Sequence, residues 1–107
     1  MRPIYVIKKD GRREKFEREK IKHGIMKALE KRPVSPEKTD QIIERIEEKI
    51  RRTGKEEISS KQIGEYVMEQ LKKTDHVAYI RFASVYRSFA DINSFEDEIK
   101  KLTKTKK

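Results

Sequence analysis

Four charged side chains near the amino terminus have types and spacings suited to binding an anion. Lys8 and Lys9 end a strand-forming run, and Lys20 falls in the first turn of an expected helix, where backbone N–H groups favour anions. If a turn at residues 10–11 brings both strand-end lysines to one edge, the three ammonium groups can surround a polyphosphate. Glu14 can then accept from an amino or hydroxyl group, such as an adenine or a ribose. The alternatives are a solvated charged hairpin and an ordinary cross-strand ion pair.

Two arginines and two tyrosines stand out in a later apolar segment. Arg81 and Arg87 need partners if they are buried, so we expect either ion pairs with the Glu-rich second helix or contacts with a ligand or subunit. Tyr79 and Tyr86 are seven residues apart and share a helix face, which favours core or interface packing over base stacking. Of these four, Tyr86 and Arg87 are candidates for a ligand or interface contact. Arg12, a basic residue of the amino-terminal third, is a further candidate.

The composition excludes several kinds of chemistry. The chain has no Cys, which rules out disulfides, thiolate metal sites and Cys nucleophiles. His23 and His76 lack metal-binding spacing, so no metal site is predicted. The four glycines are too dispersed for a P-loop or a Rossmann loop. Because no nucleophile and base can be placed together either, we predict that the protein is not an enzyme.

The net charge is concentrated near the amino terminus. Over 107 residues, 28 Lys and Arg against 19 Asp and Glu give +9, and the first 32 residues carry 12 basic and 5 acidic side chains, a net +7. This asymmetry indicates a localised anionic partner: a nucleic acid, a nucleotide or an acidic membrane. No apolar run is long enough to cross a membrane and no signal peptide is visible, so we expect a soluble, cytoplasmic protein without a membrane partner.

The elements that must position these residues follow from periodicity and turn signals. Residues 1–16 predict a β-hairpin around Asp10-Gly11. Apolar residues at spacings of three and four predict a helix from about Arg18 to Lys31, and Ser35 and Gly54 are expected to bound a second one.

The second half of the chain predicts one strand and three more helices. A short extended segment over 57–59 is followed by a helix capped by Ser60. Asp75 is expected to cap a fourth helix, whose apolar residues cover most of its circumference and predict a buried central position. Asn93 or Ser94 is expected to cap the last helix. We expect the fourth and fifth helices to contribute to a subunit interface, because the apolar face of the last helix needs an apolar partner.

These elements predict an α+β fold of one domain. A mostly helical bundle of four to five helices should be capped by a small three-stranded sheet, made of the β-hairpin and the short strand. We expect the domain to cover residues 1–102 and a disordered basic tail to cover residues 103–107.

Four segments, in order, are similar to one known family. The string VIKKDGRREKFEREKI resembles the opening of the ATP-cone, a small regulatory nucleotide-binding domain. Three further strings resemble the ATP-cone of NrdR-type repressors of ribonucleotide reductase genes: EKRPVSPE, EISSKQIGEYVMEQL and VAYIRFASVYRSF. The resemblance extends from about Ile4 to Leu102.

The resemblance implies a ligand and a site. The ligand would be ATP or dATP together with Mg²⁺, because phosphate oxygens commonly bind this ion. By position, the base and sugar would lie near Val6, Glu14 and Ile21, the phosphates near Lys8, Lys9 and Lys20, and a small hydroxyl at Ser60.

The resemblance also implies a function in regulation. Nucleotide occupancy would control homo-oligomerisation without turnover. DNA would be bound only through a four-Cys zinc ribbon, which this chain does not contain. The alternatives are a basic nucleic-acid-binding module and a regulatory subunit that docks on a separate enzyme. Nucleic-acid binding would be steeply salt-dependent.

Overall fold

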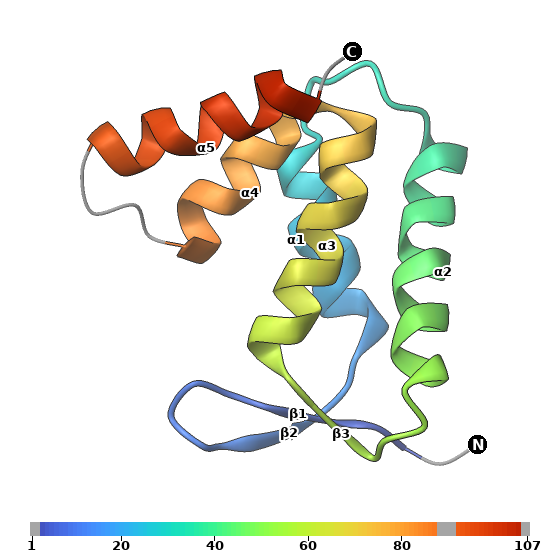
Figure 1. Ribbon diagram of the computed structural model, residues 1–107. Coiled ribbons are helices and arrows are strands. Elements are labelled where there is room, and N and C mark those ends of the chain that lie inside the picture. Colours follow the sequence, from blue (N-terminus) through green and yellow to red (C-terminus); the bar gives the residue numbers. More distant parts are fainter. Residues whose placement is uncertain (1–2, 88–91, 106–107) are drawn as a thin grey trace.

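A computed structural model describes residues 3–87 and 92–105, and it places a small sheet at one end of a set of helices (Figure 1). The α+β fold class predicted from the sequence is confirmed. The elements are β1 (Tyr5–Ile7), β2 (Arg13–Lys15), α1 (Arg18–Ala28), α2 (Pro36–Arg52), β3 (Glu57–Ser59), α3 (Ser60–Thr74), α4 (His76–Arg87) and α5 (Ile92–Thr105).

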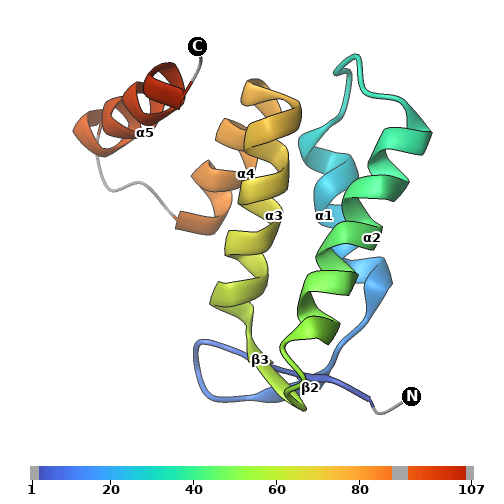
Figure 2. The same cartoon turned by 45° about the vertical axis from the view of Figure 1, so that its right-hand side comes forward.

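The sheet joins the hairpin to the short third strand in the order β2-β1-β3. β1 pairs with β2 antiparallel, with Val6 opposite Glu14, and with β3 parallel, with Val6 opposite Ile58. Gly11 has a φ of 89°, which allows the tight turn between β1 and β2. The sheet therefore lies across the ends of α1, α2 and α3, as Figures 1 and 2 show.

The helix boundaries confirm several of the predicted caps and ends and correct others. Ser35 caps α2 by accepting from the backbone N–H of Lys38 at 3.1 Å. The cap of α3 is Ser59, whose hydroxyl accepts from Gln62 at 3.0 Å, and not Ser60, which is the first helical residue. α1 ends at Ala28 rather than near Lys31, because the chain there turns into a left-handed conformation with φ 60° at Lys31.

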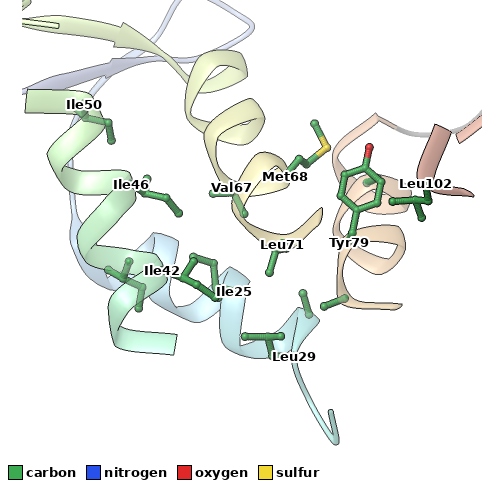
Figure 3. Close-up of a cluster of buried hydrophobic side chains, with 14 of the residues drawn as sticks. Ile25, Leu29, Ile42, Ile46, Ile50, Val67, Met68, Leu71, Tyr79 and Leu102 are labelled. Carbon is green, nitrogen blue, oxygen red and sulfur yellow. The ribbon is translucent and has the colours of Figure 1, made fainter. Parts of the chain in front are cut away.

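The hydrophobic core lies between α1, α2 and α3 (Figure 3). Ile25 of α1, Ile42 of α2 and Leu71 of α3 are fully buried. α3 is the central helix, since it packs against α2 on one side and α4 on the other and continues directly from β3. Burial of this set of aliphatic side chains is the main source of stability in such a small domain.

The prediction that α4 is buried all round is wrong. Its buried residues are the small Ala78 and Ala83 and the larger Tyr79, which let α4 lie close to α1 and α3. Elsewhere on α4, Val77 is 41% exposed and Val85 is 82% exposed. The nearly continuous apolar sequence of this helix therefore includes exposed as well as buried residues.

The last helix is longer than expected. α5 begins at Ile92, so Asn93 and Ser94 lie inside its first turn, and it continues to Thr105, past the predicted end of the domain at residue 102. Residues 106–107 lie outside the described part of the chain. Leu102 is buried against the core beside Tyr79 (Figure 3), whereas Ile99 is 38% exposed.

Candidate functional site

A pocket of about 240 Å³ lies between the sheet and the adjoining ends of α1, α3 and α4. The β1–β2 pairing and the start of α1 bring its charged side chains together, and α3 and α4 supply its wall. Six of the seven residues predicted to bind nucleotide line this pocket: Val6, Lys8, Glu14, Lys20, Ile21 and Ser60. The structure thus brings together residues that are up to 54 positions apart in the sequence, counted from Val6 to Ser60.

Glu14 is held between two of the predicted phosphate-binding lysines. Its carboxylate lies 3.2 Å from the Nζ atom of Lys20 and 3.5 Å from that of Lys8. The hydrogen bond from Lys20, together with the charges of Lys20 and Lys8, holds the pKa of Glu14 below its ordinary value. All three side chains remain partly exposed, so the cluster faces solvent at the mouth of the pocket and carries a net positive charge.

The wall opposite this charged cluster is apolar and aromatic. The rings of Phe82 and Tyr86 stack with centroids 6.0 Å apart and an interplanar angle of 22°. The hydroxyl of Tyr86 donates to the backbone carbonyl of Lys61 at 2.6 Å. The ring of Tyr86 also lies directly against Gly64, where any side chain would collide with it. The absence of a Cβ at Gly64 is therefore what lets this tyrosine reach α3.

Lys9 and Arg12 lie outside the pocket. Lys9 is exposed and is not among the lining residues, because it follows β1 where the hairpin turns away from the helices. The guanidinium of Arg12 pairs with Asp10 across the turn, with an N···O distance of 2.7 Å. The structure therefore does not place Lys9 with the other predicted phosphate-binding lysines, and Arg12 is engaged at the tip of the hairpin.

The two arginines of α4 do not pair with the Glu-rich second helix, contrary to one of the sequence-based alternatives. Arg81 donates to the backbone carbonyls of Ala28 and Glu30, at 3.1 and 2.7 Å, and so caps the carboxyl end of α1. Arg87 pairs instead with Glu98 of α5 at 2.7 Å. It also approaches Glu65 of α3 at 3.3 Å. The reason is that α4 packs against α1, α3 and α5, leaving α2 on the far side of α3.

The Arg87 pair belongs to a buried polar cluster. Glu98 is only 3% exposed, and it accepts from the hydroxyl of Tyr79 as well as from Arg87. Burial raises the pKa of Tyr79 to about 12, and the hydrogen bond to Glu98 adds to this effect. Burial also acts to raise the pKa of Glu98, but the Tyr79 hydrogen bond and the charges of Arg87 and Lys101 outweigh it, so that pKa is lowered.

Several pocket residues were not singled out from the sequence. They are Lys15, Phe16, Glu17, Gly24, Ile63, Gly64, Val67 and Phe82. The apolar ones occur in ordinary amphipathic patterns, which do not distinguish a residue that fills the core from one that lines a hollow. Gly64 in the middle of a helix was the available signal, because such a glycine costs about 1 kcal/mol relative to alanine and needs a packing reason.

Two further properties follow from the described residues. Nowhere in residues 3–87 and 92–105 do three or more His, Cys, Asp or Glu side chains gather in a way that could hold a metal ion. Over the same residues, no helix combines the length and apolarity needed to cross a membrane.

The amino-acid sequence was compared with models of known domain families. The ATP cone domain model matches residues 4–92, and the chain belongs to the ATP-cone family.

Three relatives of similar sequence are bacterial proteins named transcriptional repressor NrdR. The protein of Caldicellulosiruptor bescii is 59% identical over 100 residues, which are 94% of this chain and 65% of that protein. The protein of Kosmotoga olearia is 55% identical over 94% of this chain and 64% of its own length. For Thermotoga neapolitana the identity is 54%, over 97% of this chain and 67% of that protein. The chain spans about two thirds of the length of these curated relatives.

Proposed function

We propose that this chain is a regulatory, non-catalytic domain that binds ATP or dATP. The observation that carries the proposal is the placement of Lys8 and Lys20 on either side of Glu14, at the mouth of a pocket with an apolar, aromatic wall. Membership of the ATP-cone family supports the same ligand class.

The two halves of the pocket suit the two halves of a nucleotide. A volume of about 240 Å³ is below the roughly 300–1,000 Å³ of sites that enclose a whole drug-sized ligand. We therefore place the base and sugar inside, against Val6, Ile21 and the aromatic wall, and the phosphates outside, against Lys8 and Lys20. Lysine ammonium groups form strong charge-assisted hydrogen bonds with phosphate oxygens.

Glu14 would exchange partners when a nucleotide binds. In the structure it neutralises part of the charge of the two lysines. A triphosphate would compete for these lysines and free the carboxylate to accept from the ribose or the adenine amino group. Mg²⁺ would be bound by phosphate oxygens and water, as is usual for this ion at nucleotide sites.

The regulatory output we propose is a change in self-association. The relatives of similar sequence are named transcriptional repressors. In such a protein, nucleotide occupancy would set the oligomeric state of the ATP-cone and thereby control promoter binding, with DNA contacted by a zinc ribbon that this chain does not contain. This function would be performed in the cytoplasm, where bacterial DNA is located.

Isothermal titration calorimetry with ATP, dATP and GTP tests the ligand class. We expect heat with both adenine nucleotides and a much weaker signal with GTP. Replacing Lys20 by Gln should weaken ATP binding by about tenfold, since one charge-assisted hydrogen bond contributes roughly 1.5 kcal/mol.

The matched control is Lys73→Gln, which removes an exposed lysine near the far end of the same helix that carries Ser60. It should bind ATP like the unmodified chain. Equal affinities for ATP and GTP, or equal losses in the two lysine variants, would contradict the proposed site.

A further inference from the structure

We propose that the last turn of α4 couples the nucleotide pocket to α5: a bound nucleotide displaces Tyr86, and Arg87 beside it then releases Glu98. This inference rests on the proposed nucleotide binding and assigns the contact that transmits it. Arg87 is a positioning residue in this scheme, because it does not line the pocket.

Tyr86 is the part of the pocket wall that can yield to a ligand. Its ring lies against Gly64, and its hydroxyl is held by one hydrogen bond to the carbonyl of Lys61. The pocket is smaller than sites that enclose a whole drug-sized ligand, so a base and sugar that fill it would press on this wall. On the other side of the ring lies a larger groove of about 890 Å³ between α1, α4 and α5, which Tyr86 also lines. The ring therefore has room to move away from the pocket.

Arg87 follows Tyr86 directly and faces a different helix. Its guanidinium contacts Glu98 of α5 at 2.7 Å and Glu65 of α3 at 3.3 Å. This bridge holds α5 only while the last turn of α4 keeps its place. A displacement of Tyr86 that moves this turn away from α5 would lengthen the contact between Arg87 and Glu98.

The release of Glu98 would have a large effect because this carboxylate is buried. It is 3% exposed, and Arg87 together with Tyr79 and Lys101 compensates its charge. A buried charge that loses its main ion-pair partner is unfavourable, so we expect α5 to move rather than keep Glu98 buried without Arg87. The Phe95 and Leu102 side chains of α5 would move with it and become available to a second copy of the chain.

Thermodynamic linkage predicts whether breaking the Arg87–Glu98 pair strengthens or weakens nucleotide binding. If nucleotide binding weakens the Arg87–Glu98 pair, then breaking the pair must strengthen nucleotide binding by the same factor. Couplings between sites commonly amount to about fivefold or more. We therefore expect Arg87→Gln to bind ATP about fivefold more tightly than the unmodified chain, although Arg87 does not line the pocket.

The test combines calorimetry with hydrogen exchange on the full chain, with and without saturating ATP. In the unmodified chain, ATP should speed amide exchange in α5 severalfold. In Arg87→Gln, exchange in α5 should already be fast without ATP and should change little on its addition. Glu98→Gln is a second variant that keeps the test possible if Arg87→Gln folds poorly. It is nearly isosteric and can still accept from Tyr79, and it should also bind ATP more tightly and show fast exchange in α5 without ATP.

The matched control is Arg32→Gln. Arg32 pairs with Asp75 at 3.0 Å, at the other end of α4, and the side-chain exposures of this pair, 32% and 8%, are close to the 31% and 4% of Arg87 and Glu98. This variant should bind ATP with unchanged affinity and keep the response of α5.

Three results would overturn the coupling. One is ATP binding with heat but without any change of exchange in α5. Another is unchanged or weaker ATP binding by both Arg87→Gln and Glu98→Gln, and the third is equal tightening in Arg32→Gln. These three results would leave the proposed nucleotide binding in place. Absence of binding heat in every variant, including the unmodified chain, would instead overturn the proposed function together with the coupling.

Discussion

The two ends of α3 show how one helix serves two purposes. Near its carboxyl end, Leu71 is fully buried against α1 and α2, and the space between the helices is filled. Near its amino end, Ser60 has a small side chain and Gly64 has none, and these residues line a pocket towards the sheet together with Tyr86. Stability is thus concentrated at one end of the bundle and the capacity to bind a ligand at the other.

The largest expected effect comes from opening a cavity in the hydrophobic core between α2 and the neighbouring helices. Ile46 is 1% exposed, and Ile46→Ala should lower the free energy of unfolding by about 2–5 kcal/mol, because it removes buried methyl groups and leaves a cavity. Urea denaturation measures this loss. At a temperature where the variant is folded, ATP binding should be unchanged.

The control for this substitution is Val85→Ala, because Val85 is 82% exposed and its truncation should change stability by less than about 0.5 kcal/mol. A small loss in Ile46→Ala, or a loss of ATP binding by the folded variant, would mean that the two ends are not independent.

A smaller effect on the free energy of unfolding is expected from adding a methyl group at Gly64, at the pocket end of α3. Gly64→Ala gains roughly 1 kcal/mol of helix propensity, but its methyl group collides with the Tyr86 ring, and overpacking typically costs about 1–3 kcal/mol. We expect a net destabilisation of up to about 2 kcal/mol in urea denaturation.

The double variant Gly64→Ala/Tyr86→Ala separates the two contributions. Without the ring there is no collision, so the alanine at position 64 should be stabilising in the Tyr86→Ala background. Destabilisation of the same size in both backgrounds would show that the glycine is needed for a reason other than the tyrosine.

The smallest expected effect concerns pH. The folded-state pKa of Glu98 lies below its ordinary value of 4.5, so the ionised group stabilises the folded chain above that value, and this contribution is lost as the pH falls through the lowered pKa. The difference in free energy of unfolding between the unmodified chain and Glu98→Gln should therefore shrink between pH 7 and pH 3. Denaturation curves at several pH values measure it, with Asp97→Asn, at an exposed position of the same helix, as the control. A difference that stays constant or grows on acidification would contradict the assignment of Glu98.

Local signals in the sequence predicted much of the fold. Asp10-Gly11 predicted the hairpin turn, Ser35 and Asp75 predicted helix starts, and Gly54, with φ 66°, lies where the second helix ends. These features depend on backbone conformations and hydrogen bonds within a few residues, which short patterns specify directly. The choice of Ser60 over Ser59 as a cap failed because adjacent serines give the same signal.

Long-range partners were harder to predict. The partners of Arg87 and Arg81 depend on which helices α4 contacts, and an apolar pattern does not show which face of a helix is covered. The same reason explains why α4 was expected to be buried throughout. The pocket residues Val6, Glu14 and Lys20 are predicted through the family resemblance and the hairpin geometry, whereas Phe82 looks like an ordinary helix residue.

A crystal structure of the chain with dATP tests the central claim most directly. We predict the adenine and sugar in the pocket between Val6, Ile21 and the Phe82–Tyr86 pair, with phosphate oxygens within hydrogen-bond distance of the Nζ atoms of Lys8 and Lys20. A nucleotide bound elsewhere on the molecule, or phosphates directed away from these two lysines, would contradict the account.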